Sequence, residues 1–438
     1  MKYFGTDGIR QEADKFTPDF LSSIIAGLAT YQGTDKRVLI GGDTRESTEW
    51  ILQDLSSALE TFGFDYASVG VLPTPAINYC FYHMGFDYAI DVTASHNPFT
   101  DNGIKIFERG ENSGVKLSAK GCACIEESLA SSQTYSLISP TDRENLHTDA
   151  LTLYAKHLRD YLGDVSFAGL RIGLDCANGA TSVINKQIFE ALGATVELIS
   201  ADASYNRIIN MDCGSTHLEQ LKSLVRENSL DFGIAYDGDG DRCLLVDHEG
   251  NTITGDEIIA ILADFLHLDS IAVTVMSNQG LLNWAAGRGI HTEITSVGDS
   301  NVAAAMREKG ISLGGEESGH IILPGEPTGD GILTSLMVAK VVTNTGDSLH
   351  DLASIITRLP QVSLTIPATP TQKEALGSAT ITSIIAHFSD KVKSEGGRLL
   401  VRPSGTEPKI RITLWGTDES TITNLANDLK EELCKSLN

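Results

Sequence analysis

The sequence of 438 residues is too long for one ordinary folded core, and at roughly 150 residues per domain it predicts about three domains. Hydrophobic residues make up 41% and charged residues 21%, which excludes a disordered chain and a coiled coil. The 33 basic and 58 acidic residues give a net charge of −25, which disfavours nucleic acid and anionic membrane surfaces as partners.

The amino-terminal segment, residues 1–7, lacks the apolar core of a signal peptide. The seven cysteines are scattered and odd in number, which fits reduced thiols better than a disulfide framework. Charged residues interrupt apolar stretches such as 258–266 well before they reach membrane-spanning length. These features predict a cytoplasmic protein without a membrane partner.

A strand-helix-strand pattern appears early in the chain and then recurs. Apolar residues at 38–41 and 67–72 predict two strands, and helical spacing over 51–62 predicts the helix between them. The same succession returns at 170–199 and at 271–295. We therefore expect an α/β protein with three similar mixed α/β domains in series.

A polar loop follows the apolar stretch 89–92 and contains Ser95 and His96. A serine at the end of a strand, beside histidine and before an Asn-Pro turn, is placed as a nucleophile or phosphate carrier is placed. An ordinary turn serine is the alternative. An esterase is not indicated, because Thr93 and Asn97 stand where the nucleophile elbow requires glycine.

Three aspartates alternate with glycines directly after the apolar stretch 232–236. Asp237, Asp239 and Asp241 can converge on one hard divalent cation, because the intervening glycines let the backbone curl. A solvated acidic turn is the alternative, but three such carboxylates repel strongly unless a cation or basic groups compensate. An EF-hand is excluded, since Arg242 stands where that loop requires glycine.

Two later loops carry groups suited to hydroxyls and anions. Residues 314–320 offer the carboxylate of Glu316, the hydroxyl of Ser318 and the imidazole of His320, which suit sugar hydroxyls. Residues 402–411 offer two guanidiniums, two hydroxyls and a glycine-permitted run of amides around a phosphate. Structural surface turns are the alternative for both loops.

The pattern changes near the carboxyl terminus. Residues 361–366 alternate like a half-exposed strand, and residues 373–388 have helical spacing. Two more strands are predicted at 399–402 and 410–414, followed by an amphipathic helix at 418–437. We expect a smaller C-terminal α+β domain here.

Four domains follow from these patterns, with the polar segment 130–145 as the linker between the first two. The first carries the Ser95 loop, the second the three aspartates, the third the Glu316 loop and the fourth the Arg402 loop. Their predicted bounds are residues 1–145, 146–246, 247–360 and 361–438.

Taken together and in this order, the segments resemble the α-D-phosphohexomutase superfamily, and most of all its bacterial phosphoglucosamine mutase branch. The resemblance covers essentially the whole chain. Its matching motifs are Phe4–Arg10, Ser95–Pro98, Asp212–His217, Asp237–Arg242, Glu316–His320 and Arg402–Pro408. It implies four domains around a central cleft, three of them similar, which agrees with the repeat.

The resemblance also implies a reaction. Glucosamine 6-phosphate and glucosamine 1-phosphate would be interconverted through a phosphoserine enzyme and a bisphosphate intermediate, for UDP-N-acetylglucosamine synthesis. One Mg²⁺ per subunit would serve as the metal, and hexose 1,6-bisphosphate as activator and intermediate. The implied partners are a small sugar phosphate and a second copy of the chain in a homodimer, with no nucleic acid.

Roles near the transferring phosphoryl group follow from the same resemblance. Ser95 would be phosphorylated, and the metal ligands would be a phosphoserine oxygen of Ser95 with Asp237, Asp239 and Asp241. Arg10 and Lys105 would lie beside the phosphoryl group, with Lys105 and His320 helping proton transfer. The resemblance adds two further catalytic residues, His96 and Arg242.

The resemblance assigns the remaining loops to the substrate. Glu316 and Ser318 would contact sugar hydroxyls. The phosphate that is not reacting would be held by Arg402, Ser404, Gly405, Thr406 and Arg411.

Some positions depart from the glucosamine branch, namely Leu218, Ser300, Asn301 and Glu317. They lie near the expected sugar-recognition loops, so they bear on the sugar rather than on the reaction type. Phosphomannomutase or phosphoglucomutase of the same superfamily is therefore the alternative. A catalytically silent sugar-phosphate-binding protein and a metal-dependent phosphatase are rivals from other classes.

Overall fold

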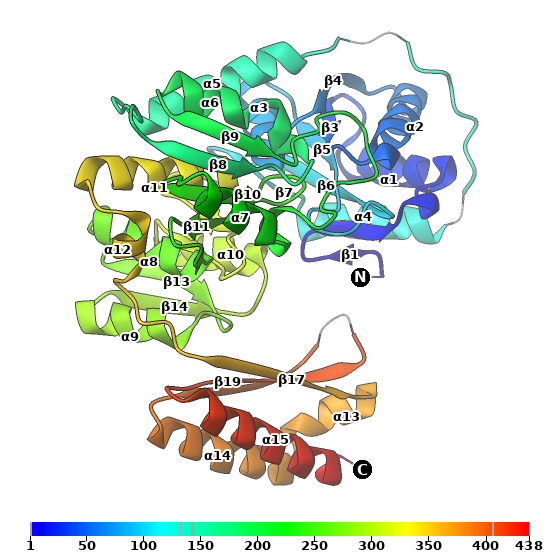
Figure 1. Ribbon diagram of the computed structural model, residues 1–438. Coiled ribbons are helices and arrows are strands. Elements are labelled where there is room, and N and C mark those ends of the chain that lie inside the picture. The colour runs from blue at the N-terminus through cyan, green and yellow to red at the C-terminus, as the bar shows by residue number, and fades with distance from the viewer. Residues whose placement is uncertain (1, 132, 142–143, 405–406, 438) are drawn as a thin grey trace. The chain divides into compact units, whose positions relative to one another are not determined.

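The structure, a computed structural model, describes residues 2–131, 133–141, 144–404 and 407–437 (Figure 1). It divides into two compact units, one of residues 1–274 and 295–354 and the other of residues 275–294 and 355–438. Within the described ranges, no helix is both long and apolar enough to cross a membrane. All seven cysteines are free.

The first sheet of the larger unit has seven strands in the order β1-β2-β6-β5-β3-β4, with β7 paired to β6. Strands β4, β3 and β5 are parallel neighbours, and β6 runs antiparallel to β5. The strands are β1 (Phe4–Gly5), β2 (Gly8–Glu12), β3 (Arg37–Gly42), β4 (Asp65–Val71), β5 (Tyr88–Val92), β6 (Asp101–Arg109) and β7 (Gly114–Lys116). The helices are α1 (Pro18–Gln32), α2 (Glu46–Phe62), α3 (Thr74–His83) and α4 (Ala119–Ala130).

Local sequence explains where these helices begin and end. Thr17 caps α1 by accepting a hydrogen bond from the Phe20 amide, and Pro18 occupies the first turn, where no amide donor is needed. Gly63 ends α2 in the left-handed conformation. The apolar faces of α1, α2 and α4 pack on the sheet in one buried core that includes Ile24 and Leu55.

The second sheet has five strands in the order β12-β11-β10-β8-β9. Strands β10, β8 and β9 are parallel, whereas β11 pairs antiparallel with β10. The strands are β8 (Arg171–Asp175), β9 (Thr195–Ile199), β10 (Phe232–Tyr236), β11 (Cys243–Asp247) and β12 (Thr252–Ile253). The helices are α5 (His147–Leu162), α6 (Asn185–Ala191) and α7 (Glu219–Glu227).

The third sheet is built on β13 (Ser270–Thr274), which pairs in parallel with β15 (Gly314–Gly315). Strand β16 (Ile321–Ile322) runs antiparallel to β15. Four helices of the larger unit belong to this part of the chain: α8 (Gly255–Phe265), which precedes β13, and α10 (Asp299–Lys309), α11 (Gly331–Thr345) and α12 (Leu349–Ala353), which follow it. The unit thus repeats one mixed α/β plan three times.

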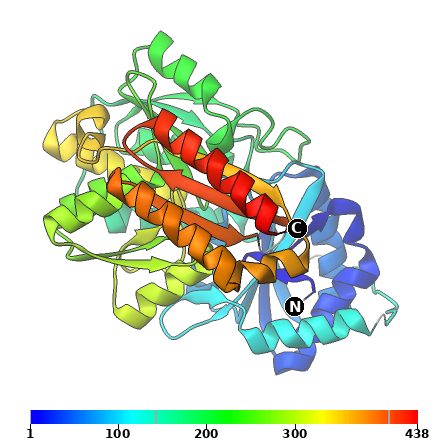
Figure 2. The same cartoon turned by 90° about the horizontal axis from the view of Figure 1, so that it is seen from below.

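The smaller unit contains a three-stranded antiparallel sheet in the order β17-β19-β18. Helices α14 and α15 lie side by side on one face of it (Figures 1 and 2), and their apolar residues form a separate core with β19. The strands are β17 (Gln361–Pro367), β18 (Arg398–Pro403) and β19 (Lys409–Trp415). The other elements of this unit are α9 (Gln279–Arg288), β14 (His291–Thr295), α13 (Pro370–Glu374), α14 (Ala379–Ser394) and α15 (Glu419–Ser436).

The predicted fold class, three mixed α/β domains followed by a smaller α+β domain, is confirmed. One element was predicted wrongly, because residues 373–388 do not form one helix. Helix α13 ends at Glu374, and α14 begins after Ser378, whose side chain accepts a hydrogen bond from the Ile381 amide. A serine with extended backbone is a helix cap, so it starts a new helix here and does not continue the old one.

Candidate active site

The predicted site loops of the larger unit lie at the carboxyl ends of parallel strands. Strands β3 and β5 pair in parallel and lead into residues 43–46 and 93–98. In the second sheet, β10 runs parallel to β8 and leads into residues 237–242. Ligands of open α/β sheets bind at this edge, so these loops are the first place to look for a site.

Ser95 is fully buried and contacts the aspartate loop of the second sheet. Its Oγ donates a hydrogen bond to Asp237 Oδ2 at 2.7 Å. The backbone of Ser95 has a φ of +53°, a left-handed conformation that is uncommon outside glycine. The structure therefore brings together two residues that lie 142 positions apart in the sequence.

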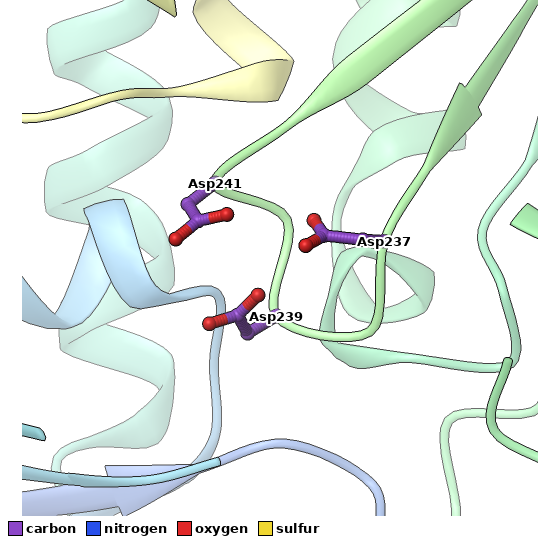
Figure 3. A group of neighbouring side chains, drawn as sticks. All are labelled: Asp237, Asp239 and Asp241. Carbon is purple, nitrogen blue, oxygen red and sulfur yellow. The ribbon is translucent and has the colours of Figure 1, made fainter. Parts of the chain in front are cut away.

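The three aspartates form one cluster in the hairpin loop between β10 and β11, and Figure 3 shows their carboxylates turned toward one another. All three are buried, and one ligand oxygen of each lies within 4.8 Å of the others. Burial, followed by the nearby charges of Asp241 and Asp239, raises the pKa of Asp237 well above its ordinary value. Among the described residues, Asp239 Oδ1 and Asp241 Oδ1 have no hydrogen-bond partner. The cluster could hold a metal ion.

Gly238 lets this loop approach Ser95. A Cβ atom at Gly238 would lie 2.7 Å from the Ser95 carbonyl oxygen and 2.9 Å from Asn210 Nδ2. Contacts that short do not occur for real side chains, so only glycine fits between the two loops.

Lys105 faces the aspartates directly, and Arg10 is linked to it through Asp7. Lys105 Nζ lies 2.7 Å from Asp239 Oδ2 and 3.0 Å from Asp241 Oδ2. It also lies 3.1 Å from Asp7 Oδ2, and Asp7 pairs in turn with Arg10. Although burial opposes it, the carboxylates of Asp239 and Asp241 raise the pKa of Lys105 well above its ordinary value. The predicted residues Arg10 and Lys105 therefore join the same charge network.

His96 lies between Ser95 and Arg242. Its Nδ1 is 3.3 Å from Ser95 Oγ and 3.1 Å from Arg242 Nη1. Because a guanidinium only donates, Nδ1 is the acceptor nitrogen of this imidazole. Burial, followed by the charges of Arg242 and Arg10, lowers the pKa of His96 to about 4. The ring is therefore neutral at pH 7. Arg242 is also close to the aspartate cluster, with its Nε 3.8 Å from Asp237 Oδ2.

Models of one family match four successive segments of the chain. They describe α/β/α domains I, II and III and the C-terminal domain of phosphoglucomutase/phosphomannomutase, and they match residues 1–136, 152–250, 254–359 and 372–432. The phosphoglucosamine mutase of Caldicellulosiruptor bescii is 40% identical, over 98% of this chain and 98% of its own. The chain belongs to the phosphoglucomutase/phosphomannomutase family.

Other members of the family agree in length and fold. Phosphoglucosamine mutases of Nocardioides and Deinococcus radiodurans are 37% and 36% identical, over 100% and 97% of this chain and 99% and 96% of their own. A phosphoglucomutase/phosphomannomutase family protein from Burkholderia thailandensis has the same fold, with a TM-score of 0.77 and 20% identity over 99% of this chain and 97% of its own. The structure of N-acetylphosphoglucosamine mutase from Aspergillus fumigatus in complex with GlcNAc-6P and magnesium has a TM-score of 0.66. It is 16% identical, over 99% of this chain and 96% of its own.

In the present chain the predicted sugar loop, residues 314–320, also belongs to the larger unit. Glu316 Oε1 accepts a hydrogen bond from the Gly298 amide at 3.0 Å, and Ser318 is exposed. His320 is buried with its Nε2 3.8 Å from Asp299 Oδ2, and neither ring nitrogen has a hydrogen-bond partner among the described residues. It lines a cavity of about 270 Å³.

Sequence reasoning misses Lys116, which lines the same cavity. Its Nζ lies 2.6 Å from Asp7 Oδ1 and 2.5 Å from Asp299 Oδ2, so it joins the amino-terminal loop to the start of α10. The residue lies in a three-residue strand. That strand is too short to show a periodic pattern, so no sequence signal singles this lysine out from the others.

The predicted phosphate loop belongs to the smaller unit. Arg402 and Arg411 are directly opposite each other on β18 and β19. Arg411 pairs with Glu407, whose amide donates to Ser404 Oγ at 3.2 Å. Burial and the nearby charge of Arg411 lower the pKa of Arg402. Two further predicted residues lie outside the described part of the chain, Gly405 and Thr406.

Proposed function

We propose that the protein is a phosphoglucosamine mutase, which interconverts glucosamine 6-phosphate and glucosamine 1-phosphate. The relatives at 36–40% identity that carry this name span nearly the whole chain. The observation that carries the proposal is the Ser95 hydroxyl, 2.7 Å from Asp237 within a buried cluster of three aspartates. A nucleophile against a carboxylate cluster suits phosphoryl transfer.

The residues present fit a magnesium ion. Three buried carboxylates converge, two of them with an oxygen that accepts no hydrogen bond from the described residues, and oxygen donors are what Mg²⁺ prefers. Asp237, Asp239 and Asp241 would hold one ion per subunit, together with a phosphoserine oxygen. When bound, it neutralises phosphate charge and polarises the phosphoryl oxygens.

Ser95 carries the phosphoryl group in this scheme. Transfer breaks the bond from phosphorus to Ser95 Oγ, forms a bond from phosphorus to a sugar oxygen, and moves the proton of that sugar hydroxyl to Oγ. Arg10 and Lys105 stabilise the charge that spreads over the phosphoryl oxygens. His96 and Arg242 flank Oγ and hold its orientation. Lys105 and His320 help to transfer the proton of the sugar hydroxyl.

The substrate needs contacts at two further places. Glu316 and Ser318 bind sugar hydroxyls, and the phosphate that is not reacting is held by Arg402, Ser404, Gly405, Thr406 and Arg411. The sugar leaves the first transfer as a hexose 1,6-bisphosphate, turns around and returns its other phosphate to Ser95. The same bisphosphate activates the unphosphorylated enzyme.

The proposal extends to the organisation of the protein. We place its four domains at residues 1–145, 146–246, 247–360 and 361–438, in the cytoplasm and in a homodimer. Its product feeds UDP-N-acetylglucosamine synthesis.

Phosphorus NMR tests the function directly. Purified protein with Mg²⁺ and a trace of glucose 1,6-bisphosphate is incubated separately with the 6-phosphates of glucosamine, glucose and mannose. The 1-phosphate signal should grow fastest from the amino sugar. Faster conversion of glucose or mannose phosphate would move the protein to another branch of the family, and release of inorganic phosphate would indicate a phosphatase.

Ser95→Ala tests whether Ser95 carries the phosphoryl group. The variant should show no conversion above background, because no phosphoserine can form. Ser420→Ala, an exposed serine in the first turn of α15, is the control and should convert at the wild-type rate. Full turnover by Ser95→Ala would refute the mechanism, and no conversion by the wild type would favour a silent binding protein.

A further inference from the structure

The backbone of Ser95 is held at both of its polar groups. Its amide donates to Thr93 Oγ1 at 2.9 Å, and its carbonyl accepts from two side chains, Arg45 and Asn210. A non-glycine residue keeps a left-handed backbone only where its surroundings impose it. These contacts are the surroundings that impose it here.

Arg45 contacts the Ser95 loop from the segment that follows β3. Its guanidinium is fully buried, and Nη2 donates to the carbonyls of Ser95 at 2.9 Å and Asn97 at 2.6 Å. Nη1 pairs with Asp43, which also accepts from Thr93 Oγ1 at 2.6 Å. The charge of Arg45 is therefore neutralised by Asp43, and its free donors hold backbone carbonyls.

Asn210 reaches the same two carbonyls from the segment between β9 and α7. Its Nδ2 donates to Ser95 O at 2.9 Å and to Asn97 O at 3.1 Å. Asn210 itself has a left-handed φ of +58°, and its amide is anchored on the Ala177 carbonyl at 2.9 Å. Donors from the loop after β3 and from the segment between β9 and α7 thus hold the same pair of carbonyl oxygens.

The hydroxyl is the one polar group of Ser95 that these backbone contacts leave able to react. With the amide and carbonyl both engaged, only Oγ can change partner, and the backbone aims it at Asp237. In-line phosphoryl transfer depends on this direction, and a misplacement of about 1 Å costs on the order of a hundredfold in rate. We propose that Arg45 and Asn210 are positioning residues, which set the direction of the Ser95 hydroxyl for phosphoryl transfer. This inference rests on the proposed function, because it takes Ser95 as the phosphoryl carrier.

Asn210→Gly is the decisive variant. Glycine adopts the left-handed backbone without strain, so the change removes the amide donors and leaves the main chain free to keep its path. Ser229→Gly is the matched control, since Ser229 has a left-handed φ of +50° and is exposed at the opposite end of β10 from Asp237. Both variants replace a left-handed residue by glycine, but only one removes a contact to Ser95.

The readout is the rate at which dephosphorylated protein takes up one phosphate from glucose 1,6-bisphosphate, followed by intact-protein mass. Ser95→Ala sets the background. We expect Asn210→Gly to be phosphorylated about 10-fold to 100-fold more slowly than wild type, with kcat reduced and KM within about twofold. The midpoint of thermal unfolding should change as little as in Ser229→Gly, because a positioning role does not require a loss of stability.

The outcomes separate this inference from the function on which it rests. Asn210→Gly phosphorylated at the wild-type rate would overturn the positioning role alone. A wild type that took up no phosphate would overturn the proposed function, and the inference with it. A loss of rate that scales with a lowered unfolding midpoint would also overturn the inference, because it would show a merely structural contact.

A second variant tests the other donor. Arg45→Lys keeps the charge beside Asp43, but an ammonium cannot reproduce the planar fork that reaches two carbonyls. The folded fraction of this variant should show the same slow phosphorylation as Asn210→Gly. Wild-type phosphorylation in folded Arg45→Lys would remove Arg45 from the proposal.

Discussion

At the scale of single residues, charges of alternating sign lie next to one another through the site. Lys105 contacts Asp239 and Asp7, and Lys116 contacts Asp7 and Asp299. Buried charges are costly unless they are paired, so each carboxylate here needs its cation. A chain with a net charge of −25 therefore places several of its 33 basic residues where an anionic substrate would bind.

Removing Lys116 tests whether the buried carboxylates depend on a paired cation. In Lys116→Met the carboxylates of Asp7 and Asp299, both largely buried, lose a partner, and we expect a loss of about 1–3 kcal/mol in the free energy of unfolding. Urea unfolding measures it. Lys435→Met breaks an exposed ion pair with Glu431 on α15 and should leave stability nearly unchanged. Equal effects of the two variants would contradict the pairing argument.

Gly238 gives a second test at this scale. Gly238→Ala places a Cβ atom 2.7 Å from the Ser95 carbonyl oxygen, so the aspartate loop must move away from Ser95. We expect at least a tenfold loss of kcat, on the order of the cost of misplacing reacting groups. Gly287→Ala in α9 is the control, because nothing lies within 4 Å of the added atom, and it should be neutral or slightly stabilising. Comparable activity in both variants would disprove the close approach.

At the scale of the element, capping residues decide where helices start, and one cap is also a buried acid. Asp330 caps α11 by accepting from the Leu333 amide at 2.9 Å, and it accepts from Tyr154 Oη at 2.7 Å. Burial raises its pKa to about 6. The ordinary value is about 3.9, so the folded protein holds this proton over a pH range in which the unfolded chain has lost it.

The sign of the resulting pH dependence follows. Between about pH 4 and pH 6 folding takes up a proton at Asp330, so this residue's contribution to stability decreases as the pH rises, by about 3 kcal/mol in total. Wild type should therefore lose stability relative to Asp330→Asn across this interval, as measured by urea unfolding at several pH values. Asparagine keeps the cap.

The cap of α15 provides the control for this experiment. Asp418 is exposed, and hydrogen bonds from Thr421 and Ser420 lower its pKa. Its contribution to stability is present at neutral pH and is lost as the pH falls below about 4. Wild type should therefore keep a nearly constant stability difference from Asp418→Asn between pH 4 and pH 6, and this difference should shrink only below about pH 4. A constant difference between wild type and Asp330→Asn from pH 4 to pH 6 would show that the proton is not held.

At the scale of the whole molecule, metal binding should be linked to the stability of the larger unit. The three aspartates belong to one folded loop and are not gathered in the unfolded chain, so Mg²⁺ should bind only the folded state. At 100 times the dissociation constant this adds about 2.7 kcal/mol. The midpoint of thermal unfolding should rise with MgCl₂, and EDTA should reverse the rise.

Two comparisons make that experiment specific. NaCl at equal ionic strength should not reproduce the shift. Asp241→Asn should lose most of it, whereas Asp347→Asn, at an exposed aspartate, should keep it. A shift that survives in Asp241→Asn would place the ion elsewhere.

The predictability of the site differs from residue to residue. Ser95 and the aspartates follow apolar strands directly and stand in short distinctive motifs, so a sequence indicates them. Lys116, Arg45 and Asn210 act through partners far along the chain, and no local pattern connects Asn210 with a serine 115 positions earlier. The break between α13 and α14 was missed because a serine within apolar helical spacing resembles any other polar residue until its side chain caps an amide.

The α/β class, the repeated plan and the candidate site loops can be predicted from the sequence, because periodicity, turn residues and motifs are local properties of a chain. The pairing of the charges, the donors that hold the Ser95 carbonyl and the need for glycine at position 238 become visible in the tertiary structure alone. Those features depend on distances between segments from different sheets. Such distances are set when the segments pack together in the folded chain, a step that leaves no local pattern in the sequence.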